Sequence, residues 1–294
     1  MIRTVTIPPE AQLAPLLGRY RAAVAARRTV FLSVLAILVI AILLSARMAE
    51  VDLALLARNA GNFLSYFSRT AHLDTGAPVW TDPVEWFWGI GRWSRLLGET
   101  LLIAYVGTLT GAVLAFGAGF LTSRNLVRSP ALCFVVRRWL EFCRTVPDIV
   151  FALIFVIAFG LGPLPGVLAI AVHTTGALGK MFSEIVESID MKPVEGIAAT
   201  GGSWFAQIRF GVLPQVLSNF ASYTLLRFEV NVRGAAVIGF VGAGGIGEEL
   251  MTAIRRFYYS DVSAILLLIM ACVMLIDIVS ERVRHRLLAW DGRR

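Results

Sequence analysis

Charged residues are scarce in this chain of 294 residues. Aspartate, glutamate, lysine and arginine together make up 16% of it, whereas hydrophobic residues make up 57% and the mean hydropathy is +0.73. A soluble globular domain typically carries about 25% charged residues. The shortage of charge therefore excludes an ordinary soluble domain and indicates an integral membrane protein.

Histidine and cysteine are also rare, with three residues of each kind. The histidines lie on separate parts of the chain, at His72, His173 and His285. The cysteines are odd in number and show no metal-ligand spacing, so we expect them to be small buried residues. The chain also lacks a nucleophile elbow and an ATPase motif. These absences predict no enzymatic activity, no metal and no cofactor bound by this chain.

Long apolar runs predict an all-α fold with about six transmembrane helices. About 20 apolar residues of helix cross a bilayer core, and unpaired backbone groups are too costly in lipid for irregular spans. The runs cover residues 29–46, 97–122, 147–162, 164–186, 215–241 and 261–280. The third and fourth runs are expected to form a helical hairpin, because only Pro163 separates them. The first run is expected to be a retained helix, because its basic arm is long for a signal peptide.

Arginines predict the orientation of these helices. They gather before the first run, between the second and third runs, and after the last run, whereas residues 47–96 balance five arginines with five acidic residues. The positive-inside bias then places both termini in the cytoplasm. The resulting division is a basic cytoplasmic arm at 1–28, a first transmembrane helix at 29–46, an external loop at 47–96 and a basic cytoplasmic tail at 286–294.

The net charge of +7 follows from the same distribution. Because the excess arginines flank apolar helices, we assign them to orientation and to anionic headgroups of the lipid bilayer, and we expect no nucleic acid as a partner.

The external loop contains an aromatic cluster just before the second run. Its members are Trp80, Trp86, Phe87, Trp88 and Trp93. One interpretation is a docking surface for an external partner. The favoured interpretation is an interfacial aromatic segment, because the cluster directly precedes Leu97.

A polar interruption at residues 190–214 separates the fourth and fifth runs. Within it Glu195 is followed six residues later by Gly201 and twelve residues after that by Leu213 and Pro214. This spacing resembles the cytoplasmic signature loop of ABC-importer permeases. The family's two alanines after the glutamate are replaced here by Gly196 and Ile197, and its isoleucine by Gly211. The resemblance implies a coupling loop that engages a separate ATPase, within a permease domain at 97–285 of the type I importer kind.

The residues of this loop suit a rigid coupling element. Asp190 is expected to cap a helix in which Glu195 occupies the first turn, where the helix dipole favours a carboxylate. Gly201 is expected to bend the chain back, and Leu213 with Pro214 to start the next helix. An apolar face for a groove of the partner is predicted from Trp204, Phe205 and Ile208. The alternative is an ordinary polar hairpin between two crossings.

The region after this loop resembles phosphonate-importer permeases. The resemblance covers residues 211–216 and 223–247, which include the run Gly242-Ala-Gly-Gly-Ile-Gly247. It implies an importer, in the inner membrane of a bacterium, for phosphonate or a related phosphorus oxyanion such as phosphate or phosphite. It also implies a homodimer, two ATPase subunits that hold ATP and magnesium, and an external solute-binding protein.

Polar residues within the fifth run are candidates for the translocation path. Charges inside a bilayer are costly and are by default functional. Glu229 and Arg233 lie four apart on one helical face and are interpreted as a structural ion pair. A second stripe is predicted to line the path, with Thr224, Arg227 and Asn231 as its members. Gly244 and Gly245 are expected in a broken segment whose N–H groups face the anion.

Two other classes of function compete with an importer subunit. A self-sufficient secondary transporter for an anionic solute should show internal repeats and paired broken helices, and no convincing repeat is visible. A membrane enzyme or a structural anchor is disfavoured by the missing catalytic residues and by the coupling loop.

Overall fold

A computed structural model describes residues 10–127 and 129–291 of the chain. It divides the chain into two compact units, Met1–Ser65 and Tyr66–Arg294. All regular elements in the described residues are helices, and the only β pairing there is an isolated bridge between His72 and Pro78. This agrees with the predicted all-α class.

The first unit consists of α1 (Glu10–Met48) and most of α2 (Leu53–Thr70). The predicted first transmembrane helix at 29–46 lies inside α1, which is longer because the described part of the basic arm continues the same helix. The apolar stretch Gly18–Met48 is long enough to cross a membrane and buries nothing within the structure. Its side chains are therefore free to face lipid.

Between α1 and the membrane helices of the second unit, the predicted external loop is largely helical. It contains all of α2, the 3₁₀ turn η1 (Val79–Thr81), the short helix α3 (Pro83–Trp86) and the first turns of α4 (Ile90–Thr122). Its aromatic residues separate into two groups. Trp93 is fully buried against α11 (Ile246–Arg255) and α12 (Tyr259–Asp291), whereas Trp80 and Trp88 are exposed.

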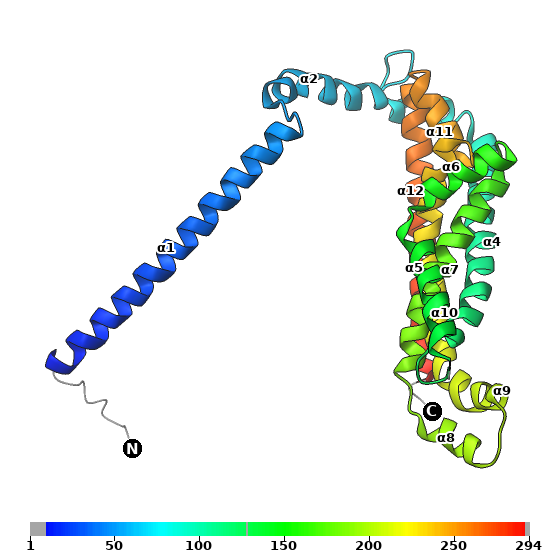
Figure 1. Ribbon diagram of the computed structural model, residues 1–294. Helices are drawn as coiled ribbons and strands as arrows, with labels where there is room; N and C mark the ends of the chain where they lie inside the picture. Colours follow the sequence, from blue (N-terminus) through cyan, green and yellow to red (C-terminus); the bar gives the residue numbers. More distant parts are fainter. Residues whose placement is uncertain (1–9, 128, 292–294) are drawn as a thin grey trace, which may run out of the picture. The chain divides into compact units, whose positions relative to one another are not determined.

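The second unit is a helical bundle built around α4, α7 (Pro163–Glu187), α10 (Leu213–Ile238) and α12 (Figure 1). Small residues allow α4 and α7 to pack closely, as is common between membrane helices. A methyl group at Gly107 would lie 2.8 Å from the Ile170 side chain, and one at Gly111 would lie 2.7 Å from that of Thr174. The packing of α4 on α7 thus requires glycine at these two positions.

The third predicted run is too short to cross a membrane alone. It forms α6 (Asp148–Phe159), whose 12 residues span only about 18 Å of helix. α6 is bent by 88° from the preceding α5 (Pro130–Thr145), at Val146 and Pro147. Proline cannot supply the N–H that would continue α5, which explains the bend.

Three helices are long and apolar enough to cross a membrane in the described residues, or five if each bent pair forms one span. The three are α1, α4 and α12. The second bent pair joins residues 204–241, which include α10 and the 3₁₀ turn η3 (Gly239–Val241), to α11. The sequence predicted six separate spans. Its fourth run forms the helix α7, which is not among these three helices and two bent pairs.

Candidate coupling element and intramembrane polar residues

The predicted coupling loop begins with α8 (Lys192–Ala199) at one end of the bundle (Figure 1). The Asp190 carboxylate accepts a hydrogen bond from the N–H of Lys192 at 3.0 Å, although Met191 rather than Asp190 occupies the N-cap position. Glu195 lies in the first turn and is exposed. Its carboxylate is therefore placed near the positive end of the helix dipole and is accessible to a partner.

The bend after α8 is a Schellman motif. Gly201 adopts a left-handed conformation with φ of +82°, and its N–H donates to the carbonyl of Ala198 at 3.0 Å. The N–H of Gly202 donates to the carbonyl of Ile197 at 3.0 Å. These two bonds satisfy carbonyls that the end of a helix leaves free. The predicted bend is thus present at the predicted glycine.

The chain then returns through α9 (Trp204–Ala206) and a π-helical turn, η2 (Gln207–Val212), before α10 begins at Leu213. Pro214 follows in the first turn of α10, as predicted. Gly211 is buried against Val194 of α8, where a methyl group would lie 3.0 Å from the Val194 Cα atom. α8 and the returning turn are therefore packed as one body.

Gln215 closes the base of this body, a role that the sequence did not indicate. Its side-chain oxygen accepts from the N–H of Asp190 at 3.1 Å, and its side-chain nitrogen donates to the carbonyl of Asp190 at 3.0 Å. The two hydrogen bonds join both ends of the loop. We call residues 190–215 the coupling element.

The predicted apolar face of the loop is wrong in one respect, because Trp204 and Ile208 pack inward. The indole nitrogen of Trp204 donates to the carbonyl of Leu126 at 3.2 Å, and both side chains contact the core between α4, α7 and α10. A partly buried tryptophan needs such an acceptor. The outward apolar side chains are Phe205 and Phe210, which are 76% and 65% exposed.

The predicted stripe along α10 separates into three different environments. Thr224 donates to the carbonyl of Phe220 within its own helix and lines a shallow groove of about 260 Å³ that is mostly apolar. Asn231 is buried, and its amide donates to the hydroxyls of Thr108 at 2.7 Å and Thr174 at 2.9 Å. Asn231 thus joins α4, α7 and α10 and has no free donor to offer a solute.

Arg227 is the member of the stripe that keeps donors free. It is partly buried, its guanidinium is hydrogen-bonded to the Nδ1 atom of His173 on α7, and its Nε atom has no hydrogen-bond partner among the described residues. The carboxylate of Asp148, the first residue of α6, interacts with it electrostatically. The three residues form a polar cluster from three helices, which we call the Arg227 cluster.

The predicted ion pair between Glu229 and Arg233 is not formed. Arg233 pairs with Asp277 of α12 at 3.1 Å, and Glu229 lies 3.9 Å from Arg284 of the same helix. Spacing by four residues places two side chains on one face, but the antiparallel α12 presents a partner to each of them. The charges therefore join two helices rather than two turns of one helix.

Gly244 and Gly245 are buried contacts rather than an open cradle. Both have positive φ values of 79°, and a methyl group at Gly244 would lie 3.0 Å from a carboxylate oxygen of Glu99. The next N–H, that of Ile246, donates to the hydroxyl of Thr100 at 2.8 Å. The two glycines allow the break before α11 to pack on α4. The N–H of Ile246 is bonded to Thr100 and is not free to bind an anion.

No group of three or more metal-ligating side chains gathers anywhere in the described part of the chain.

The chain matches known proteins over most of its length. Residues 107–288 match the family described as binding-protein-dependent transport system inner membrane component. The phosphite transport system permease protein PtxC of Stutzerimonas stutzeri is 41% identical over 198 residues, which cover 67% of this chain and 72% of that protein. The phosphate-import permease protein PhnE of Mycolicibacterium smegmatis is 39% identical over 197 residues, which cover 67% of this chain and 37% of that protein.

The fold also has a counterpart among solved structures. A chain of the MetNI methionine ABC transporter, in an inward-facing conformation, is similar with a TM-score of 0.58 and 21% identity. The match covers 70% of this chain and 98% of that chain. At this identity the likeness establishes the fold alone.

Proposed function

Because this chain belongs to the family of binding-protein-dependent transport system inner membrane components, we propose that it carries a phosphorus oxyanion across the inner membrane and is driven by a separate ATPase. It is a multi-pass permease subunit of an ABC importer. The proposed substrate class is phosphonate, phosphite or phosphate. The names of the relatives, with the resemblance at residues 211–216 and 223–247, support this class.

The coupling element carries the proposal. A part that transmits motion between subunits has to move as one body, and this element has the means to do so. Its turn is fixed by the Schellman motif at Gly201, its base by Gln215 and its inner side by Trp204. Its outer side presents Glu195 and Phe205 to a partner. We assign these two exposed side chains to contact with the ATPase.

The proposed partners follow from the family. Two copies of this chain would form the path, two ATPase subunits would bind ATP and magnesium, and an external solute-binding protein would deliver the oxyanion. The ATPases would engage the coupling element on the cytoplasmic side, with both termini of this chain on that side, as the distribution of arginines supports. ATP hydrolysis would take place entirely in the partner subunit.

Arg227 is the proposed point of contact with the oxyanion inside the membrane. A planar guanidinium matches the oxygens of phosphate-like groups, and an arginine within a membrane is by default functional. His173 and Asp148 would hold the guanidinium between transport cycles. Exchange of these partners for the oxyanion would give the weak, reversible contact that release of a solute requires.

Uptake into proteoliposomes tests the proposed function. This chain would be reconstituted with its proposed ATPase and binding protein. Uptake of radiolabelled phosphite, methylphosphonate and phosphate would be followed with ATP on the ATPase side. We expect accumulation of at least one of these anions that needs both ATP and the binding protein, with sulfate as the matched control that is not accumulated. Uptake driven by an ion gradient without ATP would instead establish a secondary transporter.

A further inference from the structure

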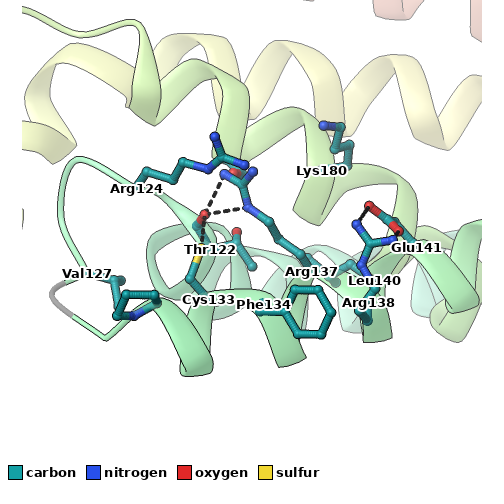
Figure 2. A pocket seen from close by; sticks show the side chains of 12 residues that line it. Thr122, Arg124, Val127, Cys133, Phe134, Arg137, Arg138, Leu140, Glu141 and Lys180 are labelled. Carbon is teal, nitrogen blue, oxygen red and sulfur yellow. Dashed lines mark hydrogen bonds and ion pairs between the residues drawn. The ribbon is translucent and has the colours of Figure 1, made fainter.

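Figure 2 shows a cavity lined by cationic side chains, and no residue of the Arg227 cluster lines it. It has a volume of about 460 Å³ and is enclosed by the end of α4, the loop that follows it, α5 and α7. Four cationic side chains and one carboxylate line it. They are Arg124, Arg137, Arg138, Lys180 and Glu141. The surplus of positive charge makes the cavity attractive to an anion.

One wall of the cavity is held in place by Arg137. Its Nε and Nη2 atoms donate to the carbonyl of Thr122 at 3.0 and 2.8 Å, and its guanidinium also pairs with Glu187 at the end of α7. The same carboxylate accepts from the backbone N–H of Arg124 at 2.9 Å. These bonds join α4, α5 and α7 before any ligand arrives, so the wall is preorganised.

Three other polar groups remain available to a ligand. The guanidinium of Arg124 has no carboxylate partner in the described residues. Lys180 has only the exposed Glu184, one turn along its own helix at 3.0 Å, and such pairs are weak. Ser183 is a buried residue of α7, and it lines the cavity. A hydroxyl on the wall of a cavity can donate a hydrogen bond to an oxygen of a ligand.

The chemistry of these groups selects the class of ligand. Two cationic side chains and a hydroxyl donor match the several oxygens of a phosphate group. Arg138, by contrast, is already engaged by Glu141 through both of its terminal nitrogens, at 2.6 and 2.8 Å. We infer that the cavity binds a phosphate group between Arg124, Lys180 and Ser183.

Two sources of that phosphate group fit the surroundings. The rim includes the exposed ring of Phe134, and the same helix exposes Val135 and Trp139, as an interfacial helix does. The acyl chains of an anionic phospholipid would pack on these apolar side chains. Free inorganic phosphate would use the same donors without the apolar rim.

A phosphate group bound in the cavity would also affect the coupling element. Asn125, next to Arg124, donates to the carbonyl of Val186 at 2.8 Å, and the following Leu126 accepts from Trp204. A phosphate held by Arg124 of the loop and Lys180 of α7 would add a link across the same junction. No residue of this site belongs to the Arg227 cluster. Binding of a phosphate group to the site can be measured without the ATPase.

Native mass spectrometry and thermal unfolding of the full chain test this site. The chain would be purified from nanodiscs of phosphatidylglycerol or of phosphatidylcholine, and in detergent it would be titrated with inorganic phosphate. The R124Q/K180Q variant removes both cations, and S183A removes only the hydroxyl. The matched control is R255Q/R256Q, which removes two exposed arginines outside this cavity.

If the lipid is the source, the native chain and the R255Q/R256Q control retain phosphatidylglycerol, and R124Q/K180Q retains at least roughly tenfold less, with a smaller loss in S183A. If free phosphate is the source, the same order of variants appears in the rise of the unfolding temperature with phosphate. Equal retention and equal temperature rise in the native chain, S183A and R124Q/K180Q would overturn the inference. S183A leaves the charges unchanged and so distinguishes loss of binding from failure to fold.

Discussion

The indole nitrogen of Trp204 lies 3.2 Å from the carbonyl oxygen of Leu126 and donates a hydrogen bond to it. The bond connects the coupling element to the loop after α4. The two hydrogen bonds between Gln215 and Asp190 close the base of the element at the start of α10. The element is therefore attached to the bundle both through Trp204 and through α10. A displacement of the element is therefore passed on to the helices.

Replacing Trp204 by phenylalanine should loosen the coupling element. The substitution keeps an aromatic ring in the core but removes the donor to Leu126, at a cost of about 1 kcal/mol. We expect faster hydrogen exchange in residues 190–212, by roughly fivefold, with unchanged exchange in α7. Phe205→Ala is the control, because that side chain points outward and should leave exchange in the isolated chain unaltered. Equal exchange in the native and Trp204→Phe chains would show that the hydrogen bond does not hold the element.

Gly201 and Gly196 should respond to alanine in opposite directions. Gly201 has φ of +82°, where an alanine is strained by about 1–2 kcal/mol. Gly196 lies within α8 with open space around it, so alanine there should stabilise the helix by up to about 1 kcal/mol. Thermal unfolding of both variants and stimulation of the ATPase measure the effect. A Gly201→Ala chain as stable and as active as Gly196→Ala would contradict the assigned turn.

Asn231→Leu should destabilise the bundle rather than alter the choice of substrate. The leucine cannot donate to the hydroxyls of Thr108 and Thr174, and interhelical hydrogen bonds of this kind contribute about 1–2 kcal/mol in model systems. We expect earlier unfolding in detergent with an unchanged order of preference among phosphite, methylphosphonate and phosphate. Thr224→Ala is the control, because its hydroxyl bonds only within α10. A changed substrate preference in Asn231→Leu would show that Asn231 lines the translocation path.

The substitution Arg227→Gln should abolish uptake while leaving assembly with the ATPase intact. Glutamine can still form a hydrogen bond but carries no charge for an oxyanion. Arg227→Lys should retain part of the uptake, because it keeps the charge without the planar fork. Co-purification of the ATPase measures assembly and uptake of labelled substrate measures function. Full uptake by Arg227→Gln would remove Arg227 from the translocation path.

Much of this arrangement follows from local patterns in the sequence. Apolar runs predict the membrane helices, and the left-handed Gly201 and the start of α10 at Leu213 lie where the motif places them. These features depend on a few neighbouring residues. For the same reason, spacing alone identified Glu229 and Arg233 as sharing one helical face.

The errors concern contacts made across the bundle. The partner of Arg233 is Asp277, 44 residues along the chain, and no helical period indicates which helix will lie beside α10. The inward position of Trp204 likewise depends on a carbonyl 78 residues earlier. The run at 147–162 contains α6, but its bend of 88° from α5 was not predicted, because the angle between two helices depends on their packing. Contacts of this range become visible only when the helices are placed in space.

Stimulation of ATP hydrolysis tests the coupling element most directly. The proposed ATPase would be co-purified with the native chain, with Glu195→Ala, with Gly201→Asp and with the control Gly196→Ala, and assayed with loaded binding protein. Stimulation by the native chain and by Gly196→Ala, with its loss in the other two variants, is the result expected of a permease that couples through residues 190–215. An ATPase that neither binds the native chain nor responds to it would contradict this account and favour a self-sufficient secondary transporter.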